Sequence, residues 1–66
     1  DESLPAALLS AFHAHPGARD HYFALPLRAR KQYNIWINMA RRAETVHKRL
    51  QESLQLLENG QELGLK

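Results

Sequence analysis

A chain this short that lacks cysteine depends on the packing of apolar faces for its stability. Its 66 residues include no cysteine, so neither a disulfide nor a thiolate metal site can hold the fold together. A chain of this length buries only about 60% of the surface that its unfolded form exposes. We therefore expect one small, marginally stable domain of packed amphipathic helices, and the absence of cysteine favours a reducing cytoplasm.

Three prolines, Pro5, Pro16 and Pro26, divide the first part of the chain. Proline suits the first turn of a helix, because its φ is preset and its missing N–H is one that a helix leaves unpaired there. The sequence predicts a short helix from Pro5 to about Ala14 and a second from Pro16 to about Leu25. Their inward-facing residues are predicted to be Leu8, Phe12, Tyr22 and Leu25.

A third helix, predicted to be the longest, begins at Pro26 and runs to a turn at residues 42–45. Its apolar positions follow the i, i+3, i+4, i+7 spacing of a buried helix face. They are Tyr33, Trp36, Ile37 and Ala40. Trp36 is expected at the centre of the core. At about 100° per residue, the opposite and solvated face is predicted to hold Lys31, Asn34, Asn38 and Arg42.

The apolar stripe restarts in a new phase after this turn, which predicts a fourth helix. Its inward-facing residues are Val46, Leu50, Ser53, Leu54 and Leu57. Asn59-Gly60 ends this helix, because glycine readily adopts the left-handed conformation found at helix ends. We expect residues 1–66 to form a single all-α domain of about four helices, two short and then two longer, with no sheet. The tail, residues 61–66, is expected to fray unless Leu63 or Leu65 folds back on the core.

Positive charge is concentrated in the middle of the chain. Residues 28–49 hold seven basic residues and one acidic residue, Glu44, a local charge of +6, whereas the whole chain carries +2. The rest of the chain therefore carries −4. Such segregation favours an anionic partner, although a solvated helix face produces the same pattern. The basic residues are Arg28, Arg30, Lys31, Arg41, Arg42, Lys48 and Arg49.

Sites for metals, cofactors and catalysis are not expected. His13 and His15 are two apart, so on a helix they point away from each other rather than toward a shared metal. Ser10 and Ser53 lack a base at usable spacing, and no glycine-rich phosphate loop is present. No apolar run reaches the ~20 residues that cross a bilayer. We expect no enzyme activity, metal, cofactor or membrane insertion, and histidines that face solvent or cap helix ends.

The second half of the chain carries a pattern that resembles one family. The pattern is Tyr33-x-x-Trp36-Ile37-x-x-Ala40-Arg41-x-x-Glu44-Thr45-x-x-x-Arg49-Leu50, followed by Leu57 and Gly60. The first half agrees with it at Pro5, Leu8, Phe12, Pro16, Ala18, Tyr22 and Leu25. Over nearly its whole length the chain resembles the bacteriocin-protection, YdeI/OmpD-associated family. It departs from the family at Val46, where an arginine is usual.

The resemblance implies a bacterial, cytoplasmic, helical domain that is commonly the C-terminal part of a longer protein. It implies a link to protection against bacteriocins or antimicrobial peptides, and it brings no catalytic residue or cofactor. We expect a non-catalytic interaction or accessory domain. Its expected partner is an acidic protein surface or another domain of the parent protein.

The predicted partner-binding surface is the basic side of the third helix and the corner that follows it. Its residues are Arg30, Lys31, Asn38, Arg41, Arg42 and Arg49. Ile35 and Met39 add apolar contacts beside them. A small basic nucleic-acid-binding domain is the alternative, because two arginine-rich helices joined by a tight turn imitate a helix-turn-helix. Against it, the turn lacks glycine and the positive residues are spread around the third helix.

The Arg41-Arg42-x-Glu44-Thr45 segment also has a purely structural interpretation. Thr45 would cap the fourth helix, and Glu44 would complement the positive end of its dipole. Arg41 or Arg49 would pair with Glu44 across the corner. In that case the segment specifies the angle between two helices and binds no partner.

Overall fold

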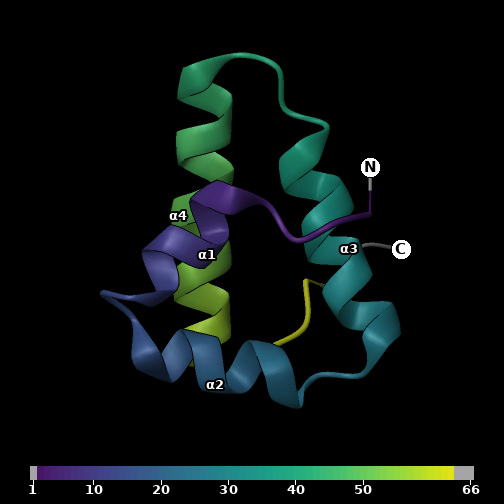
Figure 1. Cartoon of the computed structure of the whole chain (residues 1–66), viewed down its shortest axis with the longest axis vertical. Coiled ribbons are helices and arrows are strands. Elements are labelled where there is room, and N and C mark those ends of the chain that lie inside the picture. Colours follow the sequence, from purple (N-terminus) through teal and green to yellow (C-terminus); the bar gives the residue numbers. More distant parts are fainter. Residues whose placement is uncertain (1, 64–66) are drawn as a thin grey trace.

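The computed structural model describes residues 2–63, and these form four helices (Figure 1). In chain order the helices are α1 (Ala6–Phe12), α2 (Pro16–Ala24), α3 (Leu27–Asn38) and α4 (Ala43–Glu58). This confirms the predicted all-α fold of two short and two longer helices.

Two predictions about the longer helices were wrong. The longest helix is α4, with 16 residues against 12 in α3, and the connection between them spans residues 39–42 rather than 42–45. Ala43 and Glu44 form the first turn of α4, because alanine has the highest helix propensity and a carboxylate complements the positive helix end. The residue before α4 is Arg42, whose side chain makes no capping hydrogen bond. Thr45 therefore lies inside the helix and is not its cap.

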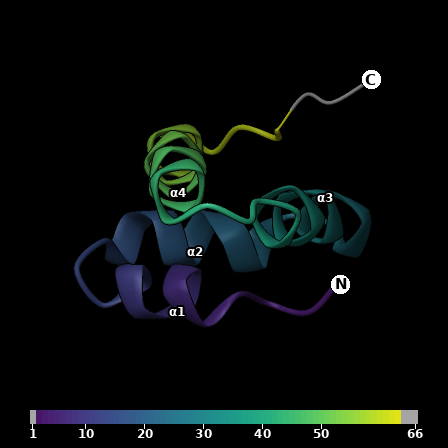
Figure 2. The same ribbon diagram turned by 90° about the horizontal axis from the view of Figure 1, so that it is seen from above.

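The helices α3 and α4 run antiparallel, with their connection at the top of Figure 1. Helix α2 crosses below them and makes the most extensive helix contact in the described chain with α4, while α1 lies against α2 and α4. Figure 2 shows that the segment before α1 and the segment after α4 pass on opposite sides of α3. Both ends of the described chain thus take part in holding α3.

A single apolar core joins all four helices. Its buried residues are Leu8, Phe12, Ala18, Tyr22, Tyr33, Ile37, Leu54 and Leu57. The predicted central role of Trp36 was wrong, because Trp36 is half-buried at the edge of this core while Tyr33 is fully buried. Helix α3 faces inward along the i, i+4 row of Ala29, Tyr33 and Ile37, which leaves Trp36 to one side.

The Tyr33 hydroxyl ties the segment after α4 to α3. It donates a hydrogen bond to the Gln61 carbonyl oxygen at 2.8 Å. Leu63, which follows shortly after Gln61 in the chain, packs against the core. Burial, with a smaller contribution from the negative charge of Glu62, raises the pKa of Tyr33 to about 12. Residues 64–66, including Leu65, lie outside the described residues.

Helix α4 ends in a hydrogen-bonded glycine motif. The Gly60 N–H bonds the Leu57 carbonyl at 2.9 Å and the Gln61 N–H bonds the Leu56 carbonyl at 3.0 Å, which is the pattern of a Schellman cap. Gly60 has φ of 68°, in the left-handed region that favours glycine. The predicted stop at Asn59-Gly60 is confirmed.

One polar group of the core has no hydrogen bond within the part of the chain that the structure describes. Ser53 is fully buried on the inner face of α4, and its Oγ has no partner there. A buried hydroxyl without a partner loses its hydration without compensation. Serine at this position therefore opposes folding relative to an apolar residue of similar size.

We predict that Tyr33 makes the domain less stable in strong base. In the unfolded chain its hydroxyl ionises near pH 10, but in the folded chain only near pH 12. The unfolded state therefore binds fewer protons between these values, and stability falls as pH rises through that window. The expected loss is about 1 kcal/mol at pH 11. Urea unfolding at several alkaline pH values measures it.

Tyr33→Phe is the control for this effect. The variant loses the bond to Gln61 and starts from a lower stability, but its stability should change less between pH 10 and 12 than that of the wild type. Equal slopes in the two proteins would show that Tyr33 is not the titrating group.

We predict that Ser53→Ala stabilises the domain by about 1 kcal/mol, because it removes a buried hydroxyl that lacks a partner. Ser10→Ala is the matched control, since Ser10 is exposed on α1 and the same exchange there changes only helix propensity. Thermal unfolding followed by circular dichroism compares them. A loss of stability in Ser53→Ala would mean that the hydroxyl has a bonding partner.

Candidate functional site at the basic side of α3 and the α3–α4 corner

The structure divides the six predicted binding residues into three groups. One pair bonds helix ends, another pair holds the segment before α1, and a third pair is exposed at the corner between α3 and α4. In that order the pairs are Arg30 and Arg49, Lys31 and Asn38, and Arg41 and Arg42.

Arg49 closes the carboxyl end of α3 from the neighbouring helix. Its Nη1 donates to the Trp36 carbonyl oxygen at 2.7 Å, and its Cζ lies 5.2 Å from the centre of the Trp36 ring. The last carbonyls of a helix lack partners within the helix and carry partial negative charge, so a cation there is favourable. A cation over a tryptophan face adds further attraction. Arg49 thus specifies the corner, but through Trp36 rather than Glu44.

Arg30 has a similar role at the end of α2. Its Nε donates to the carbonyl oxygen of Leu25, the residue that follows α2, at 3.1 Å. The side chain is half-buried. Arg30 therefore helps to set the turn from α2 into α3.

Lys31 and Asn38 contact the segment before α1 rather than solvent alone. The Lys31 ammonium lies 3.5 Å from a carboxylate oxygen of Glu2, and the Asn38 amide donates to the Ser3 carbonyl at 2.9 Å. Between them, Asn34 is buried and donates to the Glu2 carbonyl at 3.0 Å. The prediction of a solvated face was wrong for Asn34, which is buried. Lys31 and Asn38 are partly covered by the segment before α1 and partly exposed.

Arg41 and Arg42 remain exposed at the corner. The Arg42 side chain is 83% exposed and its nearest carboxylate contact, with Glu44, is long at 3.9 Å. Such a pair contributes little in water. Met39, which is 66% exposed, lies in the same connection. The corner therefore presents two cations beside an apolar side chain.

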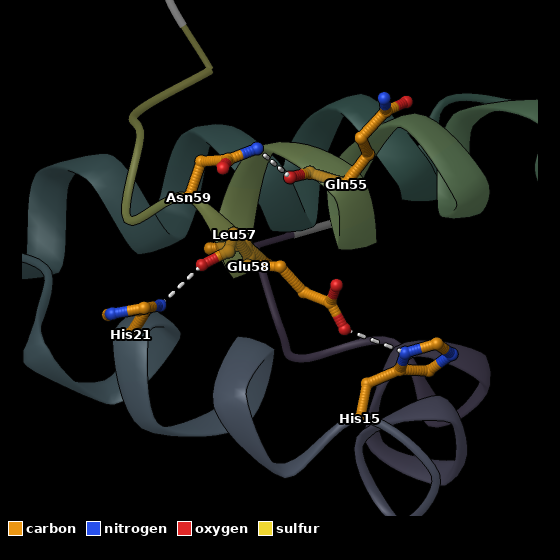
Figure 3. Close-up of polar contacts among 6 residues, drawn as sticks. All are labelled: His15, His21, Gln55, Leu57, Glu58 and Asn59. Carbon is orange, nitrogen blue, oxygen red and sulfur yellow. Dashed lines mark hydrogen bonds and ion pairs between the residues drawn. The ribbon is translucent and has the colours of Figure 1, made fainter.

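The carboxyl end of α4 holds a polar cluster that the sequence patterns did not indicate (Figure 3). His21 on α2 donates from Nδ1 to the Leu57 carbonyl at 2.7 Å, and His15 lies 3.0 Å from a carboxylate oxygen of Glu58. The Asn59 amide donates to the Gln55 carbonyl at 3.0 Å. The helix end predicted at Gly60 was the one feature of the sequence that pointed to this cluster, because the last carbonyls of a helix need hydrogen-bond donors from elsewhere. The expectation of a capping histidine is met by His21.

Two open grooves flank this end of α4. One, of about 260 Å³, is lined by Glu52, Gln55, Leu56, Asn59 and Gln61. The other, of about 270 Å³, is lined by His15, Gln51, Leu54, Gln55 and Glu58. Among residues 2–63 there is no group of three or more histidine, cysteine or carboxylate side chains arranged to hold a metal ion. Within the same range, no helix has the length and apolar character needed to cross a membrane.

Together these contacts define a small helical domain in which two arginines and one histidine bond carbonyls at helix ends. Residues 3–60 match the model of the family described as bacteriocin-protection, YdeI or OmpD-associated. The chain belongs to this family, and membership links it to bacteriocin protection. No curated protein and no solved structure matches it. Val46 is half-buried in α4.

We predict that Arg49→Ala lowers the free energy of unfolding by about 1–2 kcal/mol, because the Trp36 carbonyl and ring lose their cationic partner. Arg41→Ala, which removes an exposed arginine from the same corner, should change it by less than about 0.5 kcal/mol. Urea unfolding followed by circular dichroism measures both. Equal losses in the two variants would contradict a structural role particular to Arg49.

Proposed function

We propose that this chain is a non-catalytic interaction domain of the bacterial cytoplasm that takes part in protection against bacteriocins or antimicrobial peptides. It binds an acidic protein surface, or an acidic face of another domain of its parent protein, through the α3–α4 corner. The observation that carries this proposal is the exposure of Arg41 and Arg42 beside Met39.

The chemistry of the corner supports a protein partner. Arginine and methionine are enriched in protein interfaces, where they combine charge, planar hydrogen bonding and adaptable apolar contact. Lys48 on α4 is also exposed and adds to the positive field of residues 41–49. An acidic partner would be drawn to this field and oriented by it.

The remaining polar groups support a non-catalytic role. His21 donates to a backbone carbonyl and His15 pairs with Glu58, so both take part in contacts that hold α4 against the start and the body of α2. The grooves at this end of α4 are open to solvent and are lined mainly by amide and carboxylate side chains. Catalytic pockets typically enclose the substrate and exclude water.

Nucleic-acid binding has weaker support. Arg30 and Arg49 direct hydrogen bonds to backbone carbonyls, and Lys31 pairs with Glu2, which leaves fewer cations for phosphates. Binding to an oligonucleotide that weakens steeply with salt would favour this alternative.

We predict that reversing the charge of the corner removes partner binding. In a pull-down from bacterial lysate, the Arg41→Glu/Arg42→Glu variant should recover at least roughly tenfold less of the proteins that the wild type captures, because each reversed charge repels an acidic partner. The matched control is Arg19→Glu/Arg28→Glu. It changes net charge equally at two exposed positions on α2 and α3 and should retain capture.

Both variants must first give the wild-type circular dichroism spectrum. If the corner variant recovers the same proteins as the wild type, the proposed surface is wrong. If the two variants lose capture equally, net charge rather than the corner is responsible.

A further inference from the structure

The segment before α1 crosses α3 without helical structure and bends at Ser3. It runs from α1 across the side of α3 opposite the segment that follows α4 (Figures 1 and 2), and Pro5 at its end has extended backbone angles, with φ of −62° and ψ of 136°. Pro5 is buried and Leu4 packs against the core. We call residues 2–5 the N-terminal strap.

Two asparagines hold the backbone of the strap. Asn34 and Asn38 lie four residues apart, hence on one face of α3. Their side-chain amides donate to the carbonyls of consecutive strap residues, at 3.0 Å to Glu2 and 2.9 Å to Ser3. Contacts with main-chain carbonyls do not depend on the side chains of the bound segment. These two contacts therefore place no requirement on the side chains of the residues that they hold.

The orientation of Asn34 is fixed by a buried hydrogen bond that does not involve the strap. The Tyr22 hydroxyl donates to Asn34 Oδ1 at 2.7 Å, and Asn34 is only 6% exposed. Turning the amide over would break this buried bond, so its NH₂ group stays directed at the strap. A buried donor that is left without an acceptor is costly, which means that this position favours an occupant.

Lys31 adds charge selection to backbone recognition. It lies one turn before Asn34 on the same face and pairs with the Glu2 carboxylate at 3.5 Å. The two side chains are 44% and 62% exposed, so the pair is weak and easily exchanged. Leu4 supplies the apolar contact that follows the acidic residue.

We propose that Lys31, Asn34 and Asn38 form a binding site for a short, acidic, non-helical peptide segment of a protein partner, and that the N-terminal strap is its resident occupant. The partner segment carries an acidic residue followed within a few positions by an apolar one, as the strap does. It binds by taking the place of the strap, whose few anchors permit local release. The site is separate from the Arg41–Arg42 corner, so either proposal can fail alone.

The strap competes with any partner segment because it is part of the same chain. Its effective concentration is in the millimolar range that is typical of short connections. Loosening the strap should therefore reveal the affinity of the site. Leu4→Ala removes the apolar anchor, and Glu2→Lys replaces attraction to Lys31 with repulsion.

The test titrates the 66-residue chain with the acetylated peptide Asp-Glu-Ser-Leu-Pro and follows the side-chain amide signals of Asn34 and Asn38 by NMR. We expect both signals to shift, and the Glu2→Lys/Leu4→Ala variant to bind the peptide roughly tenfold more tightly than the wild type. Glu2→Gln, which changes only an exposed carboxylate, is a second and milder background in case the double variant unfolds. Amide signals that do not move in either background would overturn the proposal.

Three controls separate this site from other positive surfaces. Asn38→Ala in the loosened background should weaken binding roughly fivefold or more, since one backbone contact is lost. A peptide with lysine in place of glutamate should also bind more weakly. Arg41→Glu/Arg42→Glu should leave binding unchanged. The proposed site would be overturned if neither Asn38→Ala nor the lysine-containing peptide weakened binding. It would also be overturned if Arg41→Glu/Arg42→Glu abolished binding.

Discussion

The fold depends on basic side chains that reach from one helix to the carboxyl end of another. Arg30 on α3 bonds the residue after α2, Arg49 on α4 bonds Trp36 near the end of α3, and His21 on α2 bonds Leu57 near the end of α4. These contacts form a closed circuit through three helices. In a domain without disulfides, each contact gives a hydrogen-bond donor to a helix-end carbonyl and also sets the position of the neighbouring helix.

Helix α3 has a second means of attachment, because segments from both ends of the described chain hold it. The strap lies on one side, bonded by Asn34 and Asn38, and the segment after α4 lies on the other, where Gln61 accepts the Tyr33 hydroxyl. A short domain has few helices with which to cover each other. Segments outside the helices supply part of that cover, and their backbone carbonyls satisfy polar groups that would otherwise be buried alone.

These contacts change how the positive charge of residues 28–49 is understood. A run of arginines along a sequence suggests an anionic ligand, but two of them here serve helix ends and Lys31 meets Glu2. The four basic residues of this range that remain exposed are Arg28, Lys48 and the adjacent pair Arg41 and Arg42 at the corner, where we propose that the partner binds. Family membership links the chain to bacteriocin protection. In the proposed function, the exposed corner is the part of the surface that binds the partner.

Helical periodicity alone predicted four helices, the apolar stripe of α4 and the Gly60 stop, because such features depend on residues within a few positions of each other. It misplaced Trp36 and Asn34, since a helix has several faces and only its neighbours decide which are covered. The partners of Arg49, His21 and Asn38 lie 13, 36 and 35 residues away in the chain. Local sequence determined the elements and the fold class. Tertiary structure decided which polar side chains hold the fold and which are exposed, because those contacts exist only once distant segments meet.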